Sequence, residues 1–196
     1  MSTTPNSTPL RLAVIIGSTR DGRFGPTVAD WFTTLAERHT GYTLDVIDVA
    51  GLELPSAHPD WGTDRTPALT ALAERIDAAD AYVVITPEYN HSFPGALKHF
   101  IDLHRTEWEA KPVAFVSYGG HGGGLRAVEQ LRLVFAELHC VTVREVVSFH
   151  NAWNHFGEGG RAYDEDGAAG AAKVMLDQLA WWANALRTAR TAHPYN

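Results

Sequence analysis

The sequence contains a single cysteine, Cys140, among 196 residues, and this scarcity excludes two kinds of protein. One thiol cannot form an internal disulfide, and it cannot supply the several thiolates of a cysteine-built metal site. Such usage fits a reducing compartment, so we expect a cytoplasmic protein. Because Cys140 lies between a helical pattern and a strand pattern, we expect it to pack as a small apolar side chain.

Long apolar runs and an excess of positive charge are also lacking. No uninterrupted apolar stretch approaches the roughly 20 residues that a membrane-spanning helix needs. Residues 1–5 show neither the basic nor the apolar region of a signal peptide, and residues 1–9 are expected to form a flexible tail. The 16 basic and 23 acidic side chains give a net charge of −7. We therefore expect neither a membrane nor nucleic acid as a partner.

What the sequence does contain is a regular alternation of strand and helix patterns. Short runs rich in β-branched residues, typical of buried strands, occur at residues 11–16, 42–49, 81–86, 112–117 and 141–147. Apolar residues at helical spacing follow each run, and the last stripe consists of Met175, Leu179, Trp182 and Leu186. The run at 42–49 alternates more than the others, which favours an edge position.

This alternation predicts the fold class. A strand followed by a helix, repeated about five times, is typical of α/β proteins with a parallel sheet. We predict a flavodoxin-like three-layer sandwich, in which helices cover both faces of a five-stranded parallel sheet of order 2-1-3-4-5. Residues 10–190 are expected to form this single domain, followed by a C-terminal tail at residues 191–196.

The chemistry is expected where the strands end. In an open parallel sheet, ligands bind beyond the carboxyl ends of the strands, near the point where strand order reverses. Three loops of unusual composition meet this condition, at residues 17–27, 87–95 and 117–124. Two longer connections, at residues 51–66 and 150–167, are candidates for lids or subunit contacts.

The first loop combines hydroxyl groups, arginines and glycines at the start of a helix. Ser18, Thr19 and Arg20, together with the backbone N–H groups of the helix start, suit a phosphate group. Arg23 and Phe24 stand where a P-loop has Lys and Ser/Thr, so the main parts of nucleoside triphosphate chemistry are missing. The alternative interpretation is a capped turn with two solvated arginines.

The second loop presents aromatic residues and the third presents glycines. Ser92 is expected to cap the helix that follows, but this role leaves Tyr89 and Phe93 unexplained unless a ring lies against a flat ligand. Glycines in the third loop allow backbone amides to approach a ligand closely. Residues 122–127 match G-x-G-x-x-A, but this pattern comes late in the chain and is weak evidence for a dinucleotide.

Two other classes of site are disfavoured. His91, His121, His150 and His155 lack the helical spacing with carboxylates that a metal site requires, so we expect no metal. No G-x-S-x-G sequence is present, which argues against a serine hydrolase. For His121, contact with a ligand and simple exposure both remain open.

Three segments occur in a characteristic order along the chain. They are Gly-Ser-Thr-Arg-Asp-Gly-Arg at residues 17–23, Thr-Pro-Glu-Tyr-Asn-His-Ser-Phe-Pro-Gly-Ala-Leu-Lys-His-Phe-Ile-Asp at 86–102, and Ser-Tyr-Gly-Gly at 117–120. Together they resemble the NAD(P)H-dependent FMN reductase family, a flavodoxin-like group that includes quinone, azo-dye and chromate reductases. The middle segment is the most specific, and the resemblance extends from about residue 10 to residue 147.

The resemblance implies a flavoprotein that binds FMN. The FMN phosphate would lie at Ser18, Thr19, Arg20, Arg23, Phe24 and Gly25. The isoalloxazine ring would lie along Pro87, Glu88, Tyr89 and Asn90, and its pyrimidine edge at Ser117, Tyr118, Gly119 and Gly120. Backbone amides of Gly119 and Gly120 would stabilise negative charge near flavin N1.

The resemblance also implies the reaction and the assembly. Flavin N5 would carry the chemistry, so no catalytic side chain is expected. NADPH or NADH would supply a hydride, and quinones, azo compounds, metal oxyanions or free flavin would receive the electrons in a ping-pong scheme. A homodimer or homotetramer is implied, with Phe93, Leu97, Phe100 and Leu103 as candidate contacts.

Two points stay open at this stage. Many members of the family have Ser-Phe-Asn where this chain has residues 23–25, so Arg23 either replaces two small phosphate donors or points to solvent. The alternative function is a non-catalytic flavodoxin-like binding module whose phosphate loop has degraded.

Overall fold

The structure, a computed structural model, describes residues 8–39, 41–60, 63–157, 160, 162 and 165–195. Five parallel strands form one sheet in the order β2-β1-β3-β4-β5, which confirms the predicted order and direction. The strands are β1 (Leu10–Ile16), β2 (Tyr42–Asp48), β3 (Ala81–Pro87), β4 (Pro112–Gly119) and β5 (Val141–His150). Most of the expected N-terminal tail, residues 1–7, lies outside the described residues.

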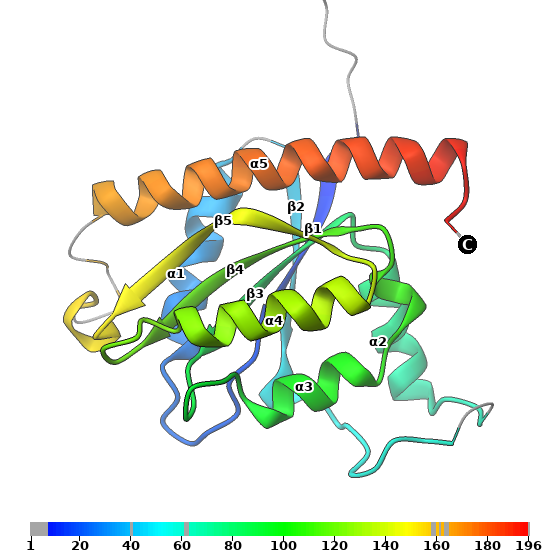
Figure 1. The fold of residues 1–196 in the computed structure, drawn as a ribbon, viewed down its shortest axis with the longest axis horizontal. Helices are drawn as coiled ribbons and strands as arrows, with labels where there is room; N and C mark the ends of the chain where they lie inside the picture. Colours follow the sequence, from blue (N-terminus) through cyan, green and yellow to red (C-terminus); the bar gives the residue numbers. More distant parts are fainter. Residues whose placement is uncertain are drawn as a thin grey trace, which may run out of the picture.

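Helices cover both faces of the sheet, as the predicted three-layer sandwich requires (Figure 1). One layer contains α1 (Gly25–Arg38) and α5 (Glu165–Ala192), and the other contains α2 (Pro67–Asp77), α3 (Gly95–Asp102) and α4 (Leu125–Glu137). Every residue of the central strand β3 is buried, whereas the edge strand β2 has one buried residue among its seven. The more alternating sequence of β2 therefore reflects its edge position.

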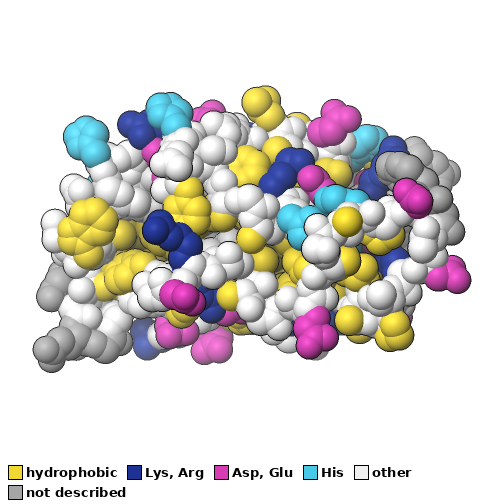
Figure 2. Space-filling view, turned by 90° about the horizontal axis from the view of Figure 1, so that it is seen from below, with side chains coloured by type: hydrophobic (Ala, Val, Ile, Leu, Met, Phe, Trp, Pro, Cys, Tyr) yellow, Lys and Arg dark blue, Asp and Glu magenta, His cyan; other side chains and the backbone are white. Residues whose placement is uncertain are grey.

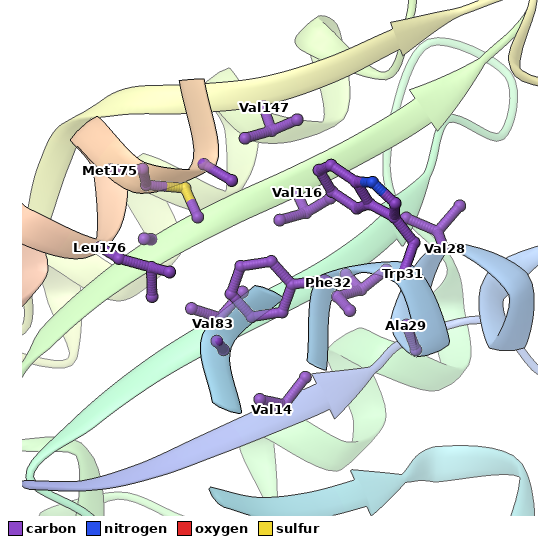
Figure 3. Close-up of a cluster of buried hydrophobic side chains, with 14 of the residues drawn as sticks. Val14, Val28, Ala29, Trp31, Phe32, Val83, Val116, Val147, Met175 and Leu176 are labelled. Carbon is purple, nitrogen blue, oxygen red and sulfur yellow. The ribbon is translucent and has the colours of Figure 1, made fainter. Parts of the chain in front are cut away.

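Two cores lie on opposite faces of the sheet because successive strand residues point to opposite sides. In β1, Val14 faces α1 and α5, and Ile15 faces the other three helices. Figure 3 shows the first core, where Trp31 and Phe32 of α1 lie close to Met175 of α5 above the sheet.

The second core contains the lone cysteine. Cys140 is 8% exposed, and burial raises the pKa of its thiol to about 12. Its Sγ donates to Trp108 O at 3.1 Å. The prediction of a packed side chain is confirmed.

The stripe predicted for α5 is wrong at Trp182, which is 37% exposed. The buried face of α5 instead runs through Ala172, Met175, Leu176, Leu179 and Ala183. The alanines let the backbone approach the sheet, and they shift the centre of the buried face away from the tryptophan. Trp182 therefore lies at the margin, where its ring packs against Trp181 with the ring centroids 5.0 Å apart.

Two of the proposed subunit contacts are also wrong. Leu97 and Phe100 are 0% exposed, because the apolar stripe of α3 packs on its own sheet and forms part of the second core. Leu103 is 9% exposed and Phe93 is half-buried, so neither offers a large free apolar surface. On the face shown in Figure 2, acidic, basic and histidine side chains are interspersed with apolar ones.

Two boundaries in the structure differ from those expected, one in the connection after β5 and one at the C-terminal tail. β5 continues to His150 and α5 begins at Glu165, so the irregular connection is shorter than expected. Helix α5 also continues to Ala192, inside the expected C-terminal tail. No helix among the described residues is long and apolar enough to cross a membrane.

Candidate functional site

The loops that follow β1, β3 and β4 gather at the carboxyl edge of the sheet (Figure 1). Gly17 N donates to Ile85 O at 2.9 Å, and Glu88 N donates to Tyr118 O at 3.1 Å. Hydrogen-bonded strand ends therefore hold the starts of these loops side by side. Strand order reverses between β1 and β3, which is where open parallel sheets bind their ligands.

The loop after β1 contains a buried hydroxyl without a partner. Ser18 is 0% exposed, and its Oγ makes no hydrogen bond with the described residues. Tyr118 Oη, at the end of β4, is likewise buried and unpaired. Burial raises the pKa of the Tyr118 hydroxyl above its usual range, and the nearby Ser18 hydroxyl only partly offsets this rise, so the group stays protonated and can donate. Native proteins rarely leave buried hydroxyls unpaired, because each costs free energy.

Both hydroxyls border the space beside Gly25, the first residue of α1. A Cβ atom at Gly25 would overlap Ser18 Oγ and lie 3.0 Å from Tyr118 Oη. Helix α1 has no side-chain cap and no acidic residue in its first turn. Two unpaired hydroxyls and an uncapped helix start thus form a cradle that suits an anion such as a phosphate.

The two arginines of this loop have different surroundings. Arg23 Nη1 and Nη2 contact the Asp48 carboxylate at 2.6 and 2.5 Å, and Nη1 also donates to Ser18 O at 2.9 Å. These hydrogen bonds to Asp48 raise the pKa of Arg23, and they tie the loop to the end of β2. Arg20 is exposed, has no carboxylate partner among the described residues, and lies 5.1 Å from the centre of the Tyr89 ring. Arg20 is therefore the arginine of this loop that an anion can reach.

The loop after β3 is a tight, strained turn. Tyr89 N donates to Ser92 O at 2.8 Å, and Ser92 N donates to Tyr89 O at 3.1 Å. Between them, Asn90 and His91 have φ angles of 50° and 73°, in the left-handed region that residues other than glycine rarely adopt. Such strain clusters at functional sites. Here it presents the half-exposed Tyr89 ring beside Arg20.

Helix α4 holds this turn in place. Ser92 Oγ donates to Gln130 Oε1 at 2.5 Å, and Gln130 Nε2 donates to His91 O at 2.8 Å. The expected capping role of Ser92 is therefore wrong. The N-cap of α3 is Pro94, and the Ser92 hydroxyl donates to Gln130 instead.

Glu88 is also bound to α4. Its carboxylate accepts from Arg126 Nη1 at 2.5 Å and from Arg126 N at 3.3 Å, and only 10% of its side chain is exposed. Glu88 is one of the residues predicted to border the ring, and its carboxylate ties the loop after β3 to α4.

Glycines fold the loop after β4 tightly against the sheet. Gly123 and Gly124 have φ angles of 59° and 84°, and a Cβ at Gly124 would lie 2.7 Å from Ser117 Cβ. Ser117 Oγ and Ser148 Oγ donate to Gly123 O at 2.9 and 2.8 Å. The Ser117 hydroxyl is thus committed to the loop itself, and the half-buried Gly120 lies further along the loop.

Aromatic packing also stabilises the loops at this edge of the sheet. The Phe24 ring lies 5.4 Å from Phe156 and 6.1 Å from Tyr118, measured between centroids. Phe24 therefore packs the loop after β1 against the segment that follows β5.

The predicted site residues thus gather at one edge but do different work. Ser18, Gly25 and Tyr118 form the buried cradle, Arg20, Tyr89 and Gly120 are at least partly exposed beside it, and Arg23, Phe24, Glu88 and Ser117 hold the loops. The sequence analysis missed Asp48 and Gln130. Asp48 ends a strand at the same edge, a position that could have indicated it, whereas no local signal indicates Gln130.

Comparison with known proteins identifies a family. The family model described as NADPH-dependent FMN reductase matches residues 10–154. An NAD(P)H-dependent FMN reductase of Schizosaccharomyces pombe is 36% identical over 120 residues, covering 58% of this chain and 60% of that protein. A 2-hydroxy-1,4-benzoquinone reductase of Burkholderia sp is 33% identical over 116 residues, covering 59% of this chain and 58% of that protein. The matched region thus spans about three fifths of the length of these two relatives.

A solved structure agrees on the fold. FerB, a flavoenzyme NAD(P)H:(acceptor) oxidoreductase from Paracoccus denitrificans, aligns with a TM-score of 0.71 at 24% sequence identity. The alignment covers 89% of this chain and 98% of FerB.

Proposed function

The chain belongs to the NADPH-dependent FMN reductase family, and from this premise we propose that it is an FMN-dependent oxidoreductase. It takes a hydride from NADPH or NADH and passes electrons to small acceptors: quinones, azo compounds, metal oxyanions or free flavin. The observation that carries this proposal is the pair of buried, unpaired hydroxyls, Ser18 Oγ and Tyr118 Oη, at the start of α1.

The residues present fit FMN at its phosphate end. Ser18 Oγ and Tyr118 Oη would donate to phosphate oxygens, which assigns Tyr118 to the phosphate end instead of the expected pyrimidine edge, and Gly25 lets both hydroxyls approach the start of α1. Thr19 and Arg20, both exposed at the rim, would complete the contacts, with Arg20 supplying the positive charge. Arg23 would act indirectly, by holding the Ser18 carbonyl and the end of β2 together.

The loops after β3 and β4 would border the ring. Pro87 and Glu88 end the strand and fix the loop, while Tyr89 and Asn90 form the exposed side of the strained turn. Gly119 and Gly120 would bring backbone amides to the pyrimidine edge, where negative charge develops on reduction.

When bound, FMN supplies the redox chemistry: it accepts a hydride from NAD(P)H and passes two electrons to the acceptor, and a quinone takes up two protons to become a hydroquinone. The protein would bind and orient the two flat substrates in turn, in a ping-pong order. No side chain of the chain is assigned a proton-transfer step. Quinones are favoured as acceptors because a matched relative is named a benzoquinone reductase.

The alternative of a degraded, non-catalytic module is not supported by the phosphate cradle. A degraded loop is expected to fill its own site or to satisfy its own polar groups, yet Ser18 Oγ and Tyr118 Oη are buried and unpaired. As further parts of the proposal, the protein acts in the cytoplasm and forms a homodimer or homotetramer.

Titration of the apoprotein with FMN tests the function, followed by addition of NADPH or NADH to the flavin-loaded protein. We expect stoichiometric binding and bleaching of the flavin bands. Arg20→Ala is expected to weaken FMN binding by about 10- to 100-fold, since one charge-assisted contact contributes roughly 1.5–3 kcal/mol. Arg38→Ala, which removes an exposed arginine at the other end of α1, is the matched control. A wild-type protein that ignores FMN would refute the function.

A further inference from the structure

One large aromatic side chain at the carboxyl edge has no role in the account above. Trp153 lies in η3 (Ala152–Asn154), the short turn that directly follows β5, and is 62% exposed. Its ring lies beside a site loop, since a Cβ built at Gly120 would lie 3.6 Å from Trp153 Cη2. Because Gly120 has no side chain, nothing on that residue separates the indole from a ligand at this edge.

The turn that carries Trp153 is anchored on both sides. Before it, Asn151 N donates to Gly120 O at 2.8 Å, and the backbone of Asn151 is left-handed, with a φ angle of 48°. Ala152 is 2% exposed, and His155 N donates to Ala152 O at 2.9 Å. After it, Phe156 is 7% exposed and packs against residues of the first core. The tryptophan is therefore the exposed residue of a turn whose neighbours are fixed.

A rigid backbone with a free aromatic face is a suitable surface for a flat ligand. Aromatic rings contact planar molecules over a large area at a small cost in conformational entropy, because a tryptophan has only two rotatable side-chain bonds. A strained, non-glycine left-handed residue immediately before the turn indicates that the position of the turn matters.

We propose that Trp153 is a specificity residue for the electron acceptor: its ring forms the side wall next to Gly120 and favours flat aromatic acceptors over compact ones. The proposal rests on the proposed function, and it deepens it by assigning a preferred acceptor class. Trp153 contacts the acceptor rather than the flavin, so its removal affects acceptor binding and leaves FMN retention unchanged.

The test compares Trp153→Ala with Trp181→Ala, which removes a tryptophan of nearly equal exposure, 65%, from the outer face of α5. Three experiments are made on each variant and on the wild type. Titration of the apoprotein gives the dissociation constant of FMN, and titration of the oxidised flavin-loaded protein without nicotinamide gives that of a naphthoquinone. Steady-state assays give KM and kcat with the naphthoquinone and with ferricyanide.

For Trp153→Ala we expect the dissociation constant and KM of the naphthoquinone to rise about 10-fold, the size typical of losing one aromatic contact. KM for ferricyanide and the FMN dissociation constant should change less than about 2-fold, and Trp153→Phe should restore most of the naphthoquinone binding. Trp181→Ala should resemble the wild type in every quantity.

The remaining outcomes overturn the proposal. Equal changes for naphthoquinone and ferricyanide would show that Trp153 does not select acceptors, and a parallel loss of FMN binding would show that it acts on the flavin. If the wild type reduces the naphthoquinone while Trp153→Ala behaves like Trp181→Ala, only the role of Trp153 fails. A wild type that binds no FMN refutes the proposed function as well.

Discussion

Two pairs of buried polar groups, one at each end of the sheet, differ in whether their hydrogen bonds are satisfied. At the amino end, Lys111 is 4% exposed and its Nζ donates to Asp77 O at 2.6 Å and to Glu107 O at 2.8 Å. Tyr82 Oη lies 2.8 Å from Glu107 O and 2.9 Å from Ile76 O. At the carboxyl end, Ser18 Oγ and Tyr118 Oη are equally buried but unpaired.

This contrast separates groups that stabilise the fold from groups that await a ligand. A satisfied buried hydrogen bond contributes roughly 1 kcal/mol to stability, whereas an unsatisfied buried group costs a similar amount or more. Stability and binding are therefore expected to respond to different substitutions. Strained left-handed residues occur at both ends, with Asn90, His91 and Asn151 at the carboxyl end and Ala110 and His139 at the amino end.

The largest effect is expected from filling the cradle. Gly25→Ala places a methyl group against Ser18 Oγ and Tyr118 Oη, so FMN binding should weaken by about 1,000-fold or more, equivalent to about 4 kcal/mol. Gly95→Ala is the matched control, because the first residue of α3 has open space around a Cβ. The measurement is FMN titration of apoprotein whose circular dichroism matches the wild type. Full FMN affinity in Gly25→Ala would mean that the phosphate lies elsewhere.

A pH effect is expected from His104, which together with His39 Nδ1 lacks hydrogen-bond partners among the described residues although it lies away from the carboxyl edge. His104 is 1% exposed with both ring nitrogens unpaired, and burial lowers its pKa from 6.5 to about 4. Below pH 6.5 the unfolded chain binds a proton that the folded chain refuses, so the free energy of unfolding should fall as pH is lowered from 7 to 4. The loss from this group reaches about 3 kcal/mol and does not grow further below pH 4.

Urea unfolding of the apoprotein at several pH values measures this loss. His104→Leu should flatten the dependence between pH 7 and 4, whereas His193→Leu, which removes an exposed histidine, should not. An unchanged slope in His104→Leu would show that His104 titrates normally in the folded protein.

A smaller loss of stability is expected from removing the Tyr82 hydroxyl, whose hydrogen bonds are satisfied. Tyr82→Phe removes a buried donor from Ile76 O and Glu107 O, although Lys111 still donates to Glu107 O. The free energy of unfolding should therefore fall by about 1–2 kcal/mol, with FMN binding unchanged. Denaturant unfolding with and without FMN checks both parts, and weaker FMN binding would argue that the two ends are coupled.

The sequence was sufficient to predict the sheet and the edge at which the three candidate loops meet. Buried strands such as residues 81–86 carry an uninterrupted apolar run, and parallel strand ends necessarily share one edge. The roles of individual side chains depend on partners far along the chain. Asp48 holds Arg23 from 25 positions away, and Gln130 binds Ser92 from 38 positions away. No local pattern encodes such pairs.

The buried face of α5 was missed for a different reason. Helical spacing marked Trp182 as apolar, but it could not show that Ala172 and Ala183 set the closest approach to the sheet. Packing distance depends on the facing layer, which a single helix does not reveal.

The most direct test of the account is Tyr118→Phe, measured for both stability and FMN binding. Because the Tyr118 hydroxyl is buried and unpaired, the free energy of unfolding of the apoprotein should stay the same or rise, while FMN binding weakens by about 5- to 10-fold. The matched variant Tyr82→Phe should show the reverse, a loss of stability at constant FMN affinity. An apoprotein destabilised by Tyr118→Phe that still binds FMN as tightly as the wild type would contradict the assignment of this hydroxyl to the ligand.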